Sequence, residues 1–136
     1  IMVILNTEGA TERELEACLS LTRSVCEKLE LKKMPYSFRT NGSLPGPVGR
    51  IFDLSEGLGH RHLRTILYGL GCADRTCFHS FRYLVHRTLQ NRKSNESYIV
   101  ITPPLSGEGA ASLKKLESAV GSSLCVLTGR EEAKVA

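Results

Sequence analysis

The fold is decided by the stretch Ile1-Met2-Val3-Ile4-Leu5-Asn6-Thr7-Glu8-Gly9-Ala10, in which a short apolar run is followed by a polar loop. The run is continuous and rich in branched side chains, which is typical of a strand buried on both faces of a parallel sheet. In an open α/β sheet, ligands bind in the loops that follow the carboxyl ends of the strands. We therefore expect any chemistry of this protein to involve the loop over residues 6–10.

A helix is predicted over about residues 11–31. Thr11 can cap its amino terminus, and Glu14 follows at the spacing of a capping box. The residues expected to face the core recur at helical spacing, and they are Leu15, Cys18, Leu19, Thr22, Cys26 and Leu29.

A second strand is predicted where Tyr36, Phe38 and Thr40 alternate with polar neighbours, and Asn41-Gly42 then marks a turn. The following loop contains Pro45, Gly46, Pro47 and Gly49, so we expect it to be the most mobile region. The run Arg50-Ile51-Phe52-Asp53-Leu54 then suits a short antiparallel partner at the edge of the sheet.

Two consecutive helices are expected next. The first has an apolar stripe of Leu63, Ile66, Leu67 and Leu70, and Gly69 and Gly71 weaken and end it. The second is predicted to open at Thr76, with one side formed by Phe78, Phe81, Leu84, Val85 and Leu89.

The rest of the chain predicts another strand, helix and strand. The strand Tyr98-Ile99-Val100-Ile101 ends at Thr102-Pro103-Pro104, because proline cannot donate to a ladder. A helix with Ala111, Leu113, Leu116 and Val120 ends at Gly121, and a last buried strand, Leu124-Cys125-Val126-Leu127, ends at Gly129. This order predicts an α/β fold, an open three-layer sandwich with a mostly parallel sheet, helices on both faces and an antiparallel edge strand. We expect one domain over residues 1–129, with residues 130–136 as a tail or the start of a missing element.

The composition is typical of an ordinary soluble globular domain, with 136 residues, 41% hydrophobic and 24% charged. The longest apolar runs have about five residues, far short of the roughly 20 needed to cross a bilayer, and no signal peptide is visible. Ile1 precedes Met2, from which we infer a domain excised from a larger protein. The odd number of cysteines, 5, favours reduced thiols and a cytoplasmic location, either free or as the soluble domain of a membrane-anchored parent.

The net charge of +4 is unevenly distributed, because basic residues gather between residues 57 and 93. This region holds the single acid Asp74 and all 4 histidines, and its basic residues are Arg61, Arg64, Arg75, Arg82, Arg87, Arg92 and Lys93. Such a block can attract nucleic acid or an acidic partner. We favour the simpler interpretation, in which these residues form the solvated faces of two amphipathic helices.

The order of elements resembles the von Willebrand factor A-like domain, and in particular bacterial proteins of unknown function that are associated with MoxR-type ATPases. The resemblance covers about residues 1–129, and it rests on residues 1–10, on Gly59-His60-Arg61-His62-Leu63, and on Tyr98-Ile99-Val100-Ile101-Thr102-Pro103-Pro104. It implies the predicted Rossmann-like sheet and a position for a metal ion at its carboxyl edge.

The metal site of that family uses an Asp-x-Ser-x-Ser loop, a threonine from a later loop and an aspartate after the fourth strand. On this sequence the first set falls on Asn6, Glu8 and Ala10, the threonine loop offers Gly59 and His60, and the late aspartate falls on Thr102 or Pro103. Mg²⁺ prefers an octahedral set of oxygen ligands that includes carboxylates, so the resemblance implies a site that has lost its ion. We expect no metal and no cofactor, and the residues expected to contact a ligand or partner are Asn6, Thr7, Glu8, Gly59, His60 and Thr102.

Other chemistry has weaker support. Cys72, Cys77 and His79, with His60 and His62 upstream, lack the paired spacing of a zinc site. The loop Ser106-Gly107-Glu108-Gly109 could meet an anion at a helix terminus, but it lacks the spacing of a dinucleotide or Walker motif. No sequence motif indicates a nucleophile with an adjacent base either, and we do not expect an enzyme.

The expected function is therefore a non-catalytic protein-interaction module of a larger bacterial protein, for which the resemblance implies a MoxR-type ATPase as a partner. One alternative is the binding of nucleic acid or an acidic partner through the arginines Arg61, Arg64, Arg75, Arg82 and Arg87. Nucleic acid is the less favoured of these, because Phe78 and Phe81 fit a buried stripe and leave few exposed aromatic rings. Another alternative is a small nucleotide-binding α/β protein. Contact with a membrane is expected only through other parts of the parent chain.

Overall fold

Strands and helices alternate along the chain in the predicted order. In a computed structural model, which describes residues 1–44 and 51–130, the elements are β1 (Met2–Leu5), α1 (Glu12–Leu31), β2 (Tyr36–Thr40), β3 (Phe52–Gly57), α2 (His60–Cys72), α3 (Phe81–Gln90), β4 (Tyr98–Thr102), α4 (Gly107–Val120), a 3₁₀ turn (Gly121–Ser123) and β5 (Leu124–Thr128). The loop over residues 45–50, including the prolines and glycines expected to be mobile, and residues 131–136 lie outside the described residues.

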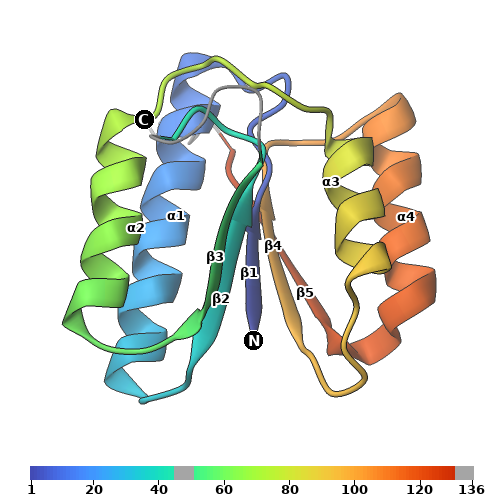
Figure 1. The fold of residues 1–136 in the computed structure, drawn as a ribbon. Coiled ribbons are helices and arrows are strands. Elements are labelled where there is room, and N and C mark those ends of the chain that lie inside the picture. Colours follow the sequence, from blue (N-terminus) through green and yellow to red (C-terminus); the bar gives the residue numbers. More distant parts are fainter. Residues whose placement is uncertain (45–50, 131–136) are drawn as a thin grey trace, which may run out of the picture.

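The sheet has five strands in the order β3-β2-β1-β4-β5. β3 is antiparallel to β2, and the other neighbours pair in parallel. Helices α1 and α2 cover one face, and α3 and α4 cover the other (Figure 1). The predicted α/β architecture, with its antiparallel edge strand, is therefore confirmed.

β1 lies at the centre of the sheet and is buried along its whole length. Val3 and Leu5 pack into the core beneath α1 and α2, whereas Met2 and Ile4 pack into the core beneath α3 and α4. Because successive side chains of a strand point to opposite faces, only a continuous apolar run can fill both cores. The interpretation of residues 2–5 as a strand buried on both faces is confirmed.

α1 begins as its capping box predicts. The Thr11 hydroxyl accepts a hydrogen bond from the Glu14 amide at 3.2 Å, and the Glu14 carboxylate accepts one from the Thr11 amide at 3.0 Å. Leu19 is only half-buried, whereas the rest of the predicted stripe is buried, namely Leu15, Cys18, Thr22, Cys26 and Leu29.

The prediction that a helix opens at Thr76 is wrong, because α3 begins at Phe81 with Ser80 as its cap. The Asp74 carboxylate accepts hydrogen bonds from the Thr76 amide at 2.7 Å and from the Ser43 hydroxyl at 2.8 Å. These contacts hold the chain in a loop, since aspartate bonded to a backbone amide two residues on favours a turn over a helix. Phe78 consequently lies outside the helix, and its side chain is 40% exposed rather than buried.

The predicted second strand is confirmed as β2, and it is buried at all five positions; Arg39 is covered there and hydrogen-bonded to Asp53 and Thr88. Two smaller expectations need correction. α2 continues through Gly69 and Gly71 to Cys72, and at Gly69 the side chain of Leu44 approaches so closely that a Cβ atom would meet it at 2.6 Å. β5 is half-exposed rather than buried, because it forms an edge of the sheet.

In the part of the chain that the structure describes, no helix is both long and apolar enough to cross a membrane.

The cysteines differ sharply in accessibility. Cys18 and Cys26 are buried, whereas Cys72 and Cys125 are exposed and Cys77 is intermediate. Burial raises the pKa of the Cys18 thiol to about 11 and that of Cys26 to about 12. Both residues act as small hydrophobic side chains of the core.

We predict that a thiol reagent at pH 8 labels Cys72 and Cys125 of the folded protein first, while Cys18 and Cys26 react only when the protein unfolds. The thiolate is the reactive form, and burial both blocks access to these two sulfurs and disfavours their ionisation. Peptide mapping after timed labelling, with a denatured sample as the fully reactive control, measures the order. Rapid labelling of Cys18 or Cys26 in the folded protein would contradict the packing of α1.

Candidate functional site

The candidate site lies at the carboxyl edge of the sheet, where β1 has β2 on one side and β4 on the other. Asn6 follows β1, Asn41 follows β2, and Thr102 is the last residue of β4. The chain places β2 and β3 on one side of β1 and then crosses to place β4 and β5 on the other side. Open α/β sheets bind ligands at such a topological switch point. All three residues are buried here.

The side chain of Asn6 connects the ends of these three strands. Its Nδ2 donates to Thr102 Oγ1 at 2.9 Å, and its Oδ1 accepts from Asn41 Nδ2 at 2.8 Å. The same Oδ1 also accepts from the Glu8 amide at 3.1 Å, which closes a turn after β1. Both polar atoms of the Asn6 amide are therefore used to hold the polypeptide together.

The other polar groups of this edge complete the network. Asn41 Oδ1 accepts from the Thr7 amide at 2.9 Å, and the Thr102 hydroxyl donates to the Pro103 carbonyl at 2.9 Å. Buried polar groups are costly unless they are hydrogen-bonded, and here they satisfy one another. Asn6, Asn41, Thr7 and Thr102 are called the amide network below.

Residues 73–80, called the crossing segment below, cover the amide network. They run over the carboxyl edge of the sheet from α2 on one face to α3 on the other (Figure 1). Cys77 forms an antiparallel bridge with Gly42, and the Phe78 amide donates to the Asn41 carbonyl at 3.2 Å. The Glu8 carboxylate accepts from the Phe81 amide at 3.2 Å, at the positive end of the α3 dipole.

The crossing segment and the first turn of α3 expose aromatic rings. Phe78 is 40% exposed and Tyr83 is 42% exposed. The His79 ring stacks on Tyr83 with ring centroids 4.5 Å apart and an interplanar angle of 21°. Phe78, His79 and Tyr83 are called the aromatic surface below.

The residues at the position of the family's metal site do not fit a metal ion. The Asn6 carbonyl oxygen already accepts two hydrogen bonds, Ala10 supplies no side-chain ligand, and the Glu8 carboxylate is bonded to the start of α3. A hard cation needs several free oxygen donors, usually with carboxylates among them. Within residues 1–44 and 51–130, the structure contains no group of three His, Cys, Asp or Glu side chains that could hold a metal.

Gly59 and His60 are not brought to this site. Gly59 precedes α2 at the edge of the sheet where the parallel strands begin. This is because β3 is antiparallel to β2 and ends at that edge. The Gly59 amide donates to both carboxylate oxygens of Glu30, at 2.9 and 3.1 Å, and His60 Nε2 lies 2.7 Å from the Arg64 guanidinium. The loop that does reach the carboxyl edge is the crossing segment.

The five arginines predicted as a basic patch are also separated. Arg61 and Arg64 lie on α2 and Arg82 and Arg87 on α3, so the two pairs are on opposite sides of the sheet (Figure 1). Arg75 lies in the crossing segment between them. The charge is therefore divided between two surfaces, which does not favour one continuous footprint for nucleic acid.

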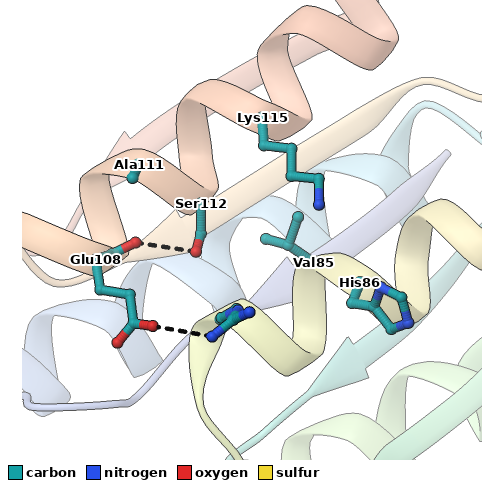
Figure 2. Close-up of a pocket in the computed structure, with 7 residues that line it drawn as sticks. Val85, His86, Glu108, Ala111, Ser112 and Lys115 are labelled. Carbon is teal, nitrogen blue, oxygen red and sulfur yellow. Dashed lines mark hydrogen bonds and ion pairs between the residues drawn. The ribbon is translucent and has the colours of Figure 1, made fainter.

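A groove lies between α3 and α4 (Figure 2). Its volume is about 210 Å³, and its lining consists of Arg82, Val85, His86, Glu108, Ala111, Ser112 and Lys115. The Arg82 guanidinium is paired with Glu108 at 3.3 Å, and the Ser112 hydroxyl donates to the Glu108 backbone carbonyl at 2.9 Å. Ligand pockets usually measure about 300–1,000 Å³, so this groove is small for a substrate.

Asn41 is a site residue that sequence reasoning missed. The Asn41-Gly42 pair was expected only to turn the chain, whereas the Asn41 side chain is buried and bonded to Thr7 and Asn6. One signal was available, because Asn41 follows β2 as Asn6 follows β1, and the carboxyl ends of neighbouring parallel strands meet at one edge.

No protein-family model matches the chain, and no curated protein matches it significantly.

We predict that Asn41→Ala lowers the free energy of unfolding by about 1–3 kcal/mol, because it leaves the buried Thr7 amide without its acceptor. Asn95→Ala is the matched control, since Asn95 is exposed in the loop before β4, and it should cost less than about 0.5 kcal/mol. Urea denaturation of the three proteins measures both values. Equal costs for the two substitutions would show that the amide network does not stabilise the fold.

Proposed function

We propose that this protein is a non-catalytic interaction module with a von Willebrand factor A-like arrangement, and that it binds a partner protein through the aromatic surface. The observation that carries the proposal is the closure of the switch point at the end of β1. The polar side chains at the switch point bond to one another, and the segment that covers them exposes aromatic rings.

The strand order supports the finer assignment of the fold. An antiparallel β3 at one edge, a central β1, and two consecutive helices between β3 and β4 are the features on which the resemblance to that family depends. The closed amide network supports the proposal that the module is non-catalytic. Catalytic side chains need polar atoms that are free to contact a substrate, and those of the network are bonded to one another.

The chemistry of the aromatic surface supports a protein partner. Tyrosine, phenylalanine and arginine are enriched at the centres of protein interfaces, where a few of them supply most of the binding energy. Phe78 and Tyr83 are partly exposed, and the 75% exposed Arg82 side chain lies between them along the chain, paired with Glu108. Stacking of His79 on Tyr83 restricts both rings before binding, which reduces the entropy lost on association.

The partner that we propose is a MoxR-type ATPase, on the basis of the family resemblance. Phe78→Ala and Tyr83→Ala should each weaken binding to the ATPase encoded in the same genome at least tenfold, which corresponds to about 1.4 kcal/mol. Tyr68→Ala is the matched control, since Tyr68 is 67% exposed on α2, which covers the other face of the sheet from α3 (Figure 1). Titration calorimetry with purified proteins measures the affinities, and equal affinities for all three variants and the parent protein would overturn the proposed surface.

The proposal also predicts the response to divalent cations. Titration of the protein with Mg²⁺ or Mn²⁺ should give no micromolar binding heat, because the oxygen atoms at the switch point are engaged in hydrogen bonds. A variant with Asn6→Ala and Glu8→Ala tests the position directly. A clear micromolar heat in the parent protein that this variant loses would overturn the assignment of the edge as closed.

A further inference from the structure

The groove between α3 and α4 is lined by more basic than acidic side chains. Arg82, His86 and Lys115 line it from the two helices, and Glu108 is the one acid of its lining. Its volume of about 210 Å³ is small for a free substrate, but a cavity of about 150 Å³ can already hold a ring the size of benzene. The groove therefore has room for one side chain of another protein.

The charged groups of the groove are unequally paired. The Arg82 guanidinium lies 3.3 Å from the Glu108 carboxylate, and both side chains are 75% exposed. An ion pair this exposed contributes little to stability, so Arg82 can exchange Glu108 for a carboxylate of another protein. The side chains of His86 and Lys115 have no ion-pair or hydrogen-bond partner among residues 1–44 and 51–130.

The floor of the groove is apolar, and the basic groups surround it. Val85 of α3 is buried, and Ala111 of α4 lies in the same lining. Arg82 and His86 are four residues apart on α3, so they share one face of the helix. Figure 2 shows the Lys115 side chain extending from α4 toward α3. A glutamate side chain matches this arrangement, because its methylene groups can contact the floor while its carboxylate meets the bases.

We propose that the α3–α4 groove binds an acidic segment of the partner protein, with a glutamate carboxylate held between His86 and Lys115. This contact deepens the proposed function and rests on it, because the acidic segment belongs to the same partner that covers the aromatic surface. Arg82 connects the two contacts, since it lines the groove and directly precedes Tyr83 on α3.

The distribution of charge favours a protein segment over nucleic acid as the occupant. A nucleic acid needs several basic groups along its phosphate backbone, whereas Arg61 and Arg64 lie on α2, across the sheet from the groove. Glu108 would also face the phosphates. One carboxylate needs only the local bases, so the groove matches an acidic side chain by its charge and by its size.

A peptide probe tests the groove without the partner. We expect a synthetic peptide of alternating glutamate and alanine residues to bind the whole chain, and to shift the NMR signals of backbone amides within residues 82–86 and 108–115. A peptide with glutamine in place of glutamate is the neutral control and should not bind. No binding of the glutamate peptide, or shifts confined to α2, would overturn the proposal.

Two neighbouring lysines provide a matched pair of variants. Lys115→Glu should weaken binding of the glutamate peptide about fivefold or more, because it replaces attraction by repulsion inside the groove. Lys114→Glu makes the same change of charge at an exposed position that lines the pocket on the side of β5. At physiological salt it should weaken binding less than about twofold, because screening limits its reach. Equal losses for the two variants would show that only the overall charge attracts the peptide, and would refute the site.

Glu108 offers a test in the opposite direction. Glu108→Gln removes the acid that competes for Arg82, so it should strengthen binding of the glutamate peptide about twofold or more. Weaker binding by this variant would contradict the exchange of carboxylates at Arg82.

Binding to the MoxR-type ATPase separates the groove from the aromatic surface. Lys115→Glu should weaken this binding more at low salt than at high salt, because the contact is between charges, whereas the loss caused by Phe78→Ala should change little with salt. The peptide carries no aromatic group, so it reports on the groove alone. An ATPase that fails to bind while the peptide binds would contradict the proposed function and not the groove, and the reverse result would contradict the groove alone.

Discussion

The burial of β1 on both faces sets the arrangement of the strands and helices around it. β1 has parallel partners on both sides and a helical layer on each face, so its side chains fill two cores. Asn6 and Thr7, which follow this strand, are buried, and buried polar groups need partners within the protein. The amide network at Asn6 meets that need, because it joins the ends of β1, β2 and β4.

The same network is the main support for the proposal of a protein-interaction module. The position where an open α/β sheet binds ligands is closed by hydrogen bonds and by the crossing segment. The side chains that a partner can contact at this edge are therefore the rings of Phe78, His79 and Tyr83. The aromatic surface thus lies at the carboxyl edge of the sheet, and its rings do not take part in the hydrogen bonds of the amide network.

Elements with local signals could be predicted from the sequence. The capping box at Thr11, the apolar stripe of α1, and the continuous apolar run of β1 each depend on residues within a few turns or positions, and the structure confirms them. The order of these elements was also sufficient to predict a mostly parallel sheet with helices on both faces.

Which loops meet at the carboxyl edge follows from contacts between distant parts of the chain. Gly59 and His60 lie at the far edge because β3 is antiparallel, and Asn41 joins the site because β2 ends beside β1. α3 begins at Phe81 and not at Thr76, because Asp74 and the bridge between Gly42 and Cys77 hold the preceding residues in a loop. Each of these outcomes depends on contacts between residues distant in the chain, and the local patterns that predict helices and strands carry no information about such contacts.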